Sequence, residues 1–200
     1  MFVGRCPLFG YRCRPSFLGA KLVVVFVTLA ACGHGVVAQA VEQAKPGPEI
    51  KELARWVGKW TYSGQSYANP FSPEAKFSGE VTRRWVLGGF FVEARWSDKD
   101  ETGYFAEGII LTGYDPKVKK LIQYEFDNEG IVSRLPITID GRSVIAPTTR
   151  TDRQGKTYHV RYTSRLSEDG TTDIGKMEYS ADGGREWKTW YEPTYKKVCE

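Results

Sequence analysis

The chain has 200 residues, of which 41% are hydrophobic, 26% charged and 14% aromatic. This composition excludes a disordered chain and an integral membrane protein, and it suits one ordinary domain behind a leader. The net charge of +4 comes from four basic residues within 1–40, a segment with no acidic residue, which leaves 28 − 4 = 24 basic and 24 acidic side chains in 41–200. A neutral domain lacks the positive surface that phosphate binding requires, so we expect no nucleic-acid partner.

Residues 1–40 predict a bacterial export signal. Basic residues up to Lys21 precede the apolar run 22–31 (LVVVFVTLAA), which is too short to span a bilayer and fits the apolar core of a signal peptide. Two cleavage sites compete. The segment 29–32 (LAAC) resembles a lipobox and makes Cys32 a candidate for lipidation, whereas 38–40 (AQA) suits ordinary signal peptidase. We therefore expect a protein that is either periplasmic or lipid-anchored in the cell envelope, and membrane contact only through this leader or anchor.

The cysteines predict neither a disulfide framework nor a metal site. Cys6 and Cys13 belong to the leader, so Cys199 remains, together with Cys32 if the lipobox is used. The chain has no CxxC motif and no Cys/His cluster at zinc spacing. We expect the fold to depend on its hydrophobic core.

The domain is expected to begin with a tether and one short helix. Residues 41–49 contain Pro46, Gly47 and Pro48, which disfavour regular structure. Apolar residues then follow the helical spacing i, i+3, i+4, i+7, namely Ile50, Leu53, Ala54 and Val57. Gly58 is expected to end this helix.

From Gly58 to residue 197 the hydrophobic period changes to two, which predicts strands. Glycine-containing turns such as Gly88-Gly89 and Asp140-Gly141 separate the apolar segments. Together with one strand directly after Gly58, the expected strands cover 76–86, 90–96, 104–112, 121–126, 131–139, 142–150, 157–166, 172–179 and 187–195.

About ten sequential strands without crossover helices predict an all-β antiparallel fold. An open sheet of this size would leave two unpaired edges, and closure into an up-and-down barrel removes both. We therefore expect a barrel over residues 50–197, and a sandwich is the alternative.

Three motifs resemble a known family. Gly58-Lys59-Trp60 after a short helix is similar to the G-x-W signature of lipocalins and related calycin barrels, in which the Trp packs across the barrel floor. The segments 84–93 (RWVLGGFFVE) and 111–116 (LTGYDP) follow in order. Together they resemble the bacterial domain-of-unknown-function family 1579 (DUF1579), which is calycin-like. This resemblance implies a fold over most of residues 50–195 and no activity.

A fourth motif, at 180–187 (SADGGREW), is similar to the Asp-box hairpin of sialidase propellers. Propellers carry several copies and this chain has one. We interpret Asp182 and Trp187 as structural, with the carboxylate holding backbone amides of a tight hairpin.

Histidine chemistry is poorly supported. The domain contains only His159, on the polar side of its strand, so a nucleophilic triad cannot be assembled. Haem barrels of the nitrobindin type share the G-x-W start, but here the His lies about 40 residues before the end instead of near the C-terminus. We expect neither haem nor another cofactor, and we assign no catalytic residue.

Arg83 is the informative exception, because it shares strand parity with Phe77, Val81 and Trp85 on the expected inner face. An inward Arg is costly unless it is paired, or reaches water at the rim. It could instead anchor an acidic ligand. The same parity makes six further side chains candidates for lining the cavity: Trp85, Trp96, Tyr124, Tyr158, Tyr162 and Met177.

The sequence thus favours a barrel that binds a small apolar or amphipathic ligand. Two alternatives stay open. One is an isomerase or hydrolase on the same barrel, which inward carboxyls or a Tyr–Arg pair would favour. The other is an envelope protein with a filled core and an exposed interaction surface.

Overall fold

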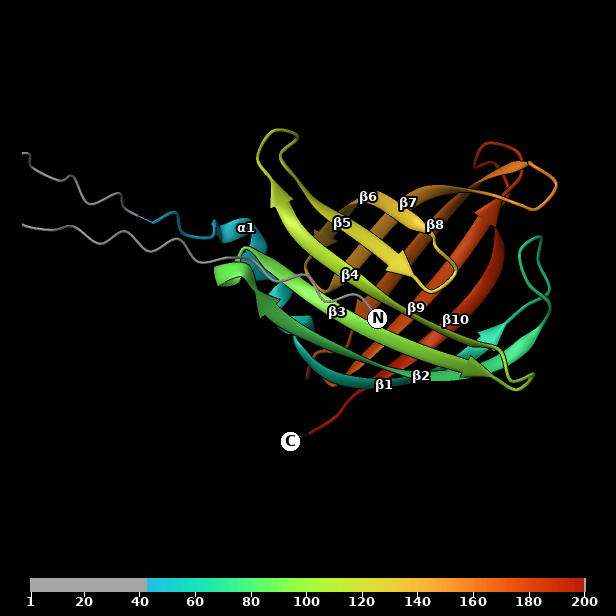
Figure 1. Cartoon of the computed structure of the whole chain (residues 1–200), viewed down its shortest axis with the longest axis horizontal. Helices are drawn as coiled ribbons and strands as arrows, with labels where there is room; N and C mark the ends of the chain where they lie inside the picture. The colour runs from blue at the N-terminus through green and yellow to red at the C-terminus, as the bar shows by residue number, and fades with distance from the viewer. Residues whose placement is uncertain (1–42, 200) are drawn as a thin grey trace, which may run out of the picture. The chain divides into compact units, whose positions relative to one another are not determined.

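The computed structural model describes residues 43–199, and the predicted leader and Cys32 lie outside this range. Ten antiparallel strands close into a barrel, in the order β1-β10-β9-β8-β7-β6-β5-β4-β3-β2, so each strand pairs with its neighbours in sequence and β1 closes on β10 (Figure 1). The up-and-down barrel is confirmed. The strands are β1 Gly58–Ser66, β2 Ala75–Val86, β3 Phe91–Asp100, β4 Phe105–Asp115, β5 Lys120–Asp127, β6 Val132–Asp140, β7 Ser143–Thr151, β8 Thr157–Leu166, β9 Thr172–Ser180 and β10 Lys188–Lys197.

The predicted helix is real but its geometry differs. The chain forms one α-helical turn, α1 (Pro48–Lys51), and continues as a 3₁₀ helix, η1 (Glu52–Trp56). A 3₁₀ helix has three residues per turn. The buried side chains are therefore Ile50, Leu53 and Trp56, spaced by three, while Ala54 is exposed. The expected i, i+4 contact at Ala54 was wrong for this reason.

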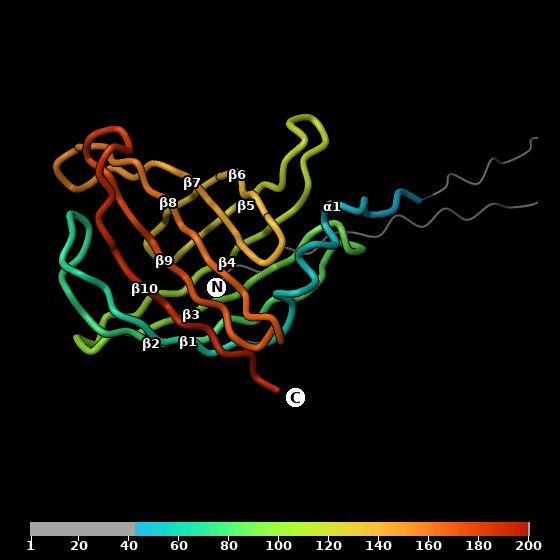
Figure 2. The backbone as a smooth tube through the Cα atoms, turned by 180° about the vertical axis from the view of Figure 1, so that it is seen from behind, coloured from blue at the N-terminus to red at the C-terminus, as the bar shows by residue number. Residues whose placement is uncertain are grey.

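This helical segment covers one end of the barrel, which we call the helix end (Figure 1). Ile50 and Leu53 pack with Val92, Leu121 and Leu135 of three strands, and Trp56 packs with Trp60. The Arg55 guanidinium also donates to the Gly141 carbonyl in the β6–β7 turn, at 2.6 Å. The short η2 turn (Leu87–Gly89) and the β4–β5 hairpin lie at the same end (Figures 1 and 2).

The opposite end, here called the loop end, is covered by the β1–β2 connection, residues 67–74. Its Phe71 ring stacks on Trp190 with centroids 4.4 Å apart, and it meets Tyr158 and Tyr179 edge-on. Trp190 reaches this cluster because the β9–β10 register shifts between Thr189 and Tyr191, leaving one extra residue. Such a bulge turns a side chain away from the face that strict alternation gives it.

Residues 42–200 form one compact unit. Its hydrogen-bonded ladder is closed and its hydrophobic clusters lie between Ile50 and Tyr195. We therefore expect this part of the chain to fold without the segment before it. Among residues 43–199, no helix is long and apolar enough to cross a bilayer.

Candidate functional site

The barrel interior retains solvent-accessible space. Trp60 and Val81, near the helix end, are almost fully buried at 0% and 3% exposure. Further along the barrel, side chains that point inward from the strands are only partly buried: Trp96, Gln123, Glu125, Tyr162, Met177, Tyr191 and Tyr195. Because these side chains face the inside of a closed sheet, their remaining exposure indicates an internal space, here called the lumen.

Arg83 lies at the floor of this lumen. It sits on β2 directly opposite Gly58 on one side and Ala94 on the other. Its guanidinium carbon is 5.8 Å from the centre of the Trp60 ring and 5.5 Å from that of Tyr195. Aromatic faces attract a cation at this distance. Among residues 43–199, however, no carboxylate lies within ion-pair distance of Arg83.

Asp173 on β9 is a buried carboxylate whose charge interacts with that of Arg83. It is 3% exposed, and its Oδ2 accepts hydrogen bonds from the Trp56 indole and the Ser164 hydroxyl, both at 3.2 Å. Burial raises the pKa of this carboxyl, and the positive charge of Arg83 partly opposes that rise. The helical segment and the lumen are thus joined through one buried carboxylate.

Three buried polar atoms on inward side chains have no hydrogen-bond partner among the residues that the structure describes. They are Arg83 Nη1, Trp96 Nε1 and Asp173 Oδ1. Val81 is the inward residue next to Arg83 on β2, and it pairs with Trp96 on β3. Arg83 Nη1 and Trp96 Nε1 therefore belong to adjoining strands. Buried polar groups are nearly always hydrogen-bonded, and an unpaired one requires an explanation. Two donors and one acceptor are therefore available around one region of the lumen.

A second polar group lies toward the loop end. The Tyr62 hydroxyl donates to Asp98 Oδ2 at 3.2 Å, and burial raises the pKa of both side chains. Burial also raises the pKa of Glu125, with the nearby Asp127 adding to it and Arg150 opposing it. These carboxyls favour their neutral forms more than exposed carboxyls do.

Most of the predicted lining residues occupy inward positions. Trp96, Tyr162 and Met177 lie in the middle of their strands and are partly buried. Tyr158 is inward but belongs to the cluster around Phe71, and its hydroxyl donates to Asp152 at 3.1 Å. Trp85 lies at the rim of the helix end with 38% exposure. Ligand contact by these residues and by Arg83 stays a prediction.

The prediction that Tyr124 faces inward was wrong. The β4–β5 register places Glu125 opposite the inward Ile110, so Tyr124 points outward, where its hydroxyl accepts from Arg134 Nε at 3.3 Å. The apolar residues of β5 lie on its outer side. There Ile122 pairs with Gly113 of β4, and the Phe91 ring of β3 packs across that glycine. An outer apolar row therefore mimics a core face in the sequence pattern.

Five inward polar or aromatic residues of the barrel were not among the candidates that the sequence offered. Sequence reasoning did not single out Tyr62, Asp98, Asp173, Tyr191 and Tyr195. Two of them follow from strand parity alone: Asp98 lies two residues after Trp96, and Asp173 lies four before Met177. Extending each inward row to the end of its strand would have found both.

The two structural motifs occupy well-defined places. The Trp60 indole donates to the Trp56 carbonyl at 3.0 Å, so the G-x-W tryptophan anchors η1 across the barrel floor. Gly58 precedes it at φ 127°, a conformation that favours glycine. In the β9–β10 hairpin, Asp182 accepts from the amides of Arg185 and Glu186, and Trp187 donates to Gly184. These hydrogen bonds stabilise the hairpin, so the motif is structural.

His159 lies on the outer face of β8, opposite Thr149 and Ser180, and is exposed. Its ring therefore does not reach the lumen. Within residues 43–199, no group of three His, Cys, Asp or Glu side chains is arranged to hold a metal ion.

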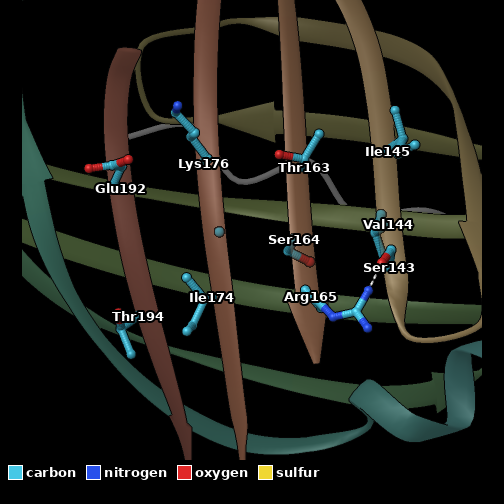
Figure 3. A pocket seen from close by; sticks show the side chains of 11 residues that line it. Ser143, Val144, Ile145, Thr163, Ser164, Arg165, Ile174, Lys176, Glu192 and Thr194 are labelled. Carbon is cyan, nitrogen blue, oxygen red and sulfur yellow. Dashed lines mark hydrogen bonds between the residues drawn. The ribbon is translucent and has the colours of Figure 1, made fainter. Parts of the chain in front are cut away.

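An open depression of about 640 Å³ lies on the outer surface of β7–β10 (Figure 3). Ile145 and Ile174 supply apolar surface there, and Arg165 donates to the Ser143 hydroxyl at 3.3 Å. Lys176 and Glu192 border it on neighbouring strands. Its walls are side chains of an ordinary strand surface, without an unpartnered buried polar group, so it is a weaker candidate than the lumen.

Comparison with known proteins supports the fold. The crystal structure of Rv2717c from M. tuberculosis is similar over 78% of this chain and 100% of that chain, with 12% identity and a TM-score of 0.56. A de novo designed fluorescence-activating β-barrel matches over 74% of this chain and 98% of its own, with 11% identity and a TM-score of 0.39, which is too low to carry an argument. No curated protein matches the sequence.

The family model of DUF1579, described as a protein of unknown function, matches residues 45–197, which is nearly the whole described domain. The chain therefore belongs to the DUF1579 family.

Proposed function

We propose that this barrel binds a small amphipathic ligand in its lumen, with Arg83, Trp96 and Asp173 holding the polar group of that ligand. The observation that carries the proposal is the set of three buried polar atoms without partners, all on inward side chains. A buried donor or acceptor left unpaired costs about 1–3 kcal/mol, and a bound ligand that pairs it recovers this energy.

The chemistry of these atoms favours an acidic or hydroxylated ligand. Arg83 Nη1 and Trp96 Nε1 are donors, which suit the oxygen atoms of a carboxylate, sulfonate or phosphate. Asp173 Oδ1 accepts a hydroxyl, or donates when this carboxyl with its raised pKa is protonated. Since all three atoms are buried, the polar group of a ligand reaches them by displacing a neighbouring side chain.

The lumen wall suits an apolar ligand body. Tyr162, Met177, Tyr191 and Tyr195 line it from β8, β9 and β10, and each keeps accessible surface. Aromatic and thioether surface with a few convergent polar groups is typical of small-molecule sites.

The test is a binding titration of residues 41–200 with 1-anilinonaphthalene-8-sulfonate, an amphipathic anion whose fluorescence rises in apolar surroundings. The Arg83→Leu variant should bind the probe at least tenfold more weakly, because one charge-assisted hydrogen bond is worth about 1.5–3 kcal/mol. Arg84→Leu is the matched control, since Arg84 points outward and bonds Glu93 at the surface. Equal affinity of the two variants would refute the site, provided that both give the near-ultraviolet circular dichroism of the native fold.

We also propose that the leader exports the barrel to the cell envelope. The apolar run 22–31 and its two cleavage motifs support this proposal. Palmitate labelling of the whole chain and of Cys32→Ala distinguishes the two routes. Labelling that disappears in the variant supports a lipoprotein, and unlabelled wild-type protein supports cleavage after residue 40.

A further inference from the structure

The helix end of the barrel exposes apolar side chains beside a group of lysines. Leu87 in the η2 turn is 69% exposed, and Phe90 directly after it is also exposed. The neighbouring β4–β5 hairpin presents Val118 among three exposed lysines, Lys117, Lys119 and Lys120. We call these six residues the end patch. Its two hairpins adjoin because Phe91 pairs with Gly113 where β3 and β4 meet this end.

The backbone holds Leu87 outward at an energetic cost. Leu87 has φ 51°, and Gly88 and Gly89 follow at 68° and 87°. Within residues 43–199, Leu87 and Lys119 are the two non-glycine residues with positive φ, and both lie in the end patch. A bulky side chain is a genuine outlier in this region, which asparagine or glycine adopts more readily. Local strain of this kind concentrates where a residue has a role outside the fold itself.

The charge of the end patch has one sign. Among the described residues, none of the three lysines lies within ion-pair distance of a carboxylate. The carboxylate at the base of the hairpin, Asp115, is instead bound by Arg134 at 3.3 Å. Exposed apolar side chains beside lysines without a carboxylate partner are the chemistry that an anionic lipid surface attracts.

The opposite end supplies the contrast. It also exposes apolar side chains, including Val132 at 70%, but carboxylates border them. Glu129 in the same hairpin accepts from the Tyr104 hydroxyl at 2.7 Å, and Asp127 stands at the base of that hairpin. These carboxylates would repel an anionic surface at the β5–β6 hairpin, so the apolar side chain of Val132 is not equivalent to those of the end patch toward a membrane.

The described chain begins beside the end patch. Pro46 lies against Gly89, because a Cβ atom placed on that glycine would be 3.3 Å from Pro46 Cγ. Residue 32 is 46 − 32 = 14 residues upstream of Pro46, a reach of at most about 50 Å. A lipid on Cys32 would therefore hold the barrel close to the bilayer, with the end patch within reach of it.

From these observations we propose that the end patch docks on an anionic lipid surface, with Leu87, Phe90 and Val118 inserted among the headgroups and the lysines in contact with lipid phosphates. This docking needs neither the lumen ligand nor the lipid on Cys32. It gives the barrel an orientation on the membrane, with its helix end toward the lipid.

The test measures sedimentation of residues 41–200 with vesicles of phosphatidylcholine containing about one third phosphatidylglycerol, beside pure phosphatidylcholine vesicles. The wild-type domain should bind the anionic vesicles, and added salt should weaken that binding. Leu87→Asn should lower the partition coefficient about tenfold. The same variant should keep or raise the thermal midpoint, because asparagine accepts this backbone conformation. A purely structural role for Leu87 would lower the midpoint instead.

Two matched controls isolate the end patch. Val132→Asn removes an equally exposed apolar side chain from the other end and should leave the binding unchanged. The triple variant K117Q/K119Q/K120Q should lose roughly a hundredfold in affinity for anionic vesicles. K99Q/K156Q/K188Q removes the same charge from the loop end and should lose far less. The docking proposal is overturned if the wild-type domain does not sediment with anionic vesicles, or if Leu87→Asn and Val132→Asn bind alike. Either result would favour a protein partner for the end patch.

Discussion

Asp173 is the residue whose replacement separates the roles of charge and hydrogen bonding in the barrel floor. Asp173→Ala removes the acceptor of the Trp56 indole and the Ser164 hydroxyl, which are both buried. Each of the two donors left unpaired costs about 1–3 kcal/mol, so the free energy of unfolding should fall by roughly 2–6 kcal/mol. Asp173→Asn keeps an acceptor oxygen at the same place and removes the buried charge. Its unfolding free energy at neutral pH should stay within about 1 kcal/mol of wild type or exceed it.

The pH dependence gives a second readout of the same substitution. Burial raises the pKa of Asp173 in the folded state above its ordinary value, which applies in the unfolded state. Between these two pKa values the folded state binds more protons than the unfolded state. Stability from this group therefore decreases as the pH rises through that window, and the loss persists above it. Urea unfolding, followed by tryptophan fluorescence from acid to neutral pH, should show this slope in wild type and a smaller one in Asp173→Asn. If Asp173→Ala proves as stable as Asp173→Asn, the hydrogen-bonding account of the floor is wrong.

Further predictions concern the lining and the loop end. Phe71→Ala removes the ring that stacks on Trp190, so stability should fall by about 2–3 kcal/mol and the lumen probe should dissociate faster in stopped-flow experiments. Gly175→Ala would drive a methyl group against the Tyr162 hydroxyl, and we expect about 1–3 kcal/mol of destabilisation together with weaker probe binding. Burial raises the pKa of Tyr162, Tyr191 and Tyr195, so these phenols should stay protonated in an ultraviolet titration until alkaline unfolding exposes them. Their stabilisation is then lost as the pH rises above the ordinary pKa of about 10, and a smooth titration of every tyrosine near that value would contradict their burial.

The fold was largely predictable because its signals are local. Period-two alternation and glycine turns mark each hairpin, and an up-and-down barrel pairs each strand with its sequence neighbour. The motif at Gly58 and Trp60 also located the floor. The helix was less predictable. Ile50 and Leu53 fit both an α-helix and a 3₁₀ helix, and the two geometries differ only in whether Ala54 or Trp56 is buried.

The candidate site was predictable only in part. Arg83 could be identified because its parity is set by apolar neighbours on its own strand. Its surroundings come from elements far away in the sequence: Asp173 and Tyr195 meet it only through the closure of β1 on β10. The face of β5 could not be read from composition, since the register with β4 decides it and a row of apolar residues lies outside.

Native mass spectrometry of residues 41–200, purified without denaturation, tests ligand binding in the lumen most directly, with an absorbance spectrum taken on the same sample. We expect an additional mass of a few hundred daltons on the wild-type domain, which is reduced in Arg83→Leu and retained in Arg84→Leu, and an absorbance spectrum without a haem band. A bare protein mass for all three, together with no affinity for the anionic probe, would contradict ligand binding and favour a barrel whose core serves the fold alone. An added mass that survives in Arg83→Leu would place the ligand away from the floor of the lumen.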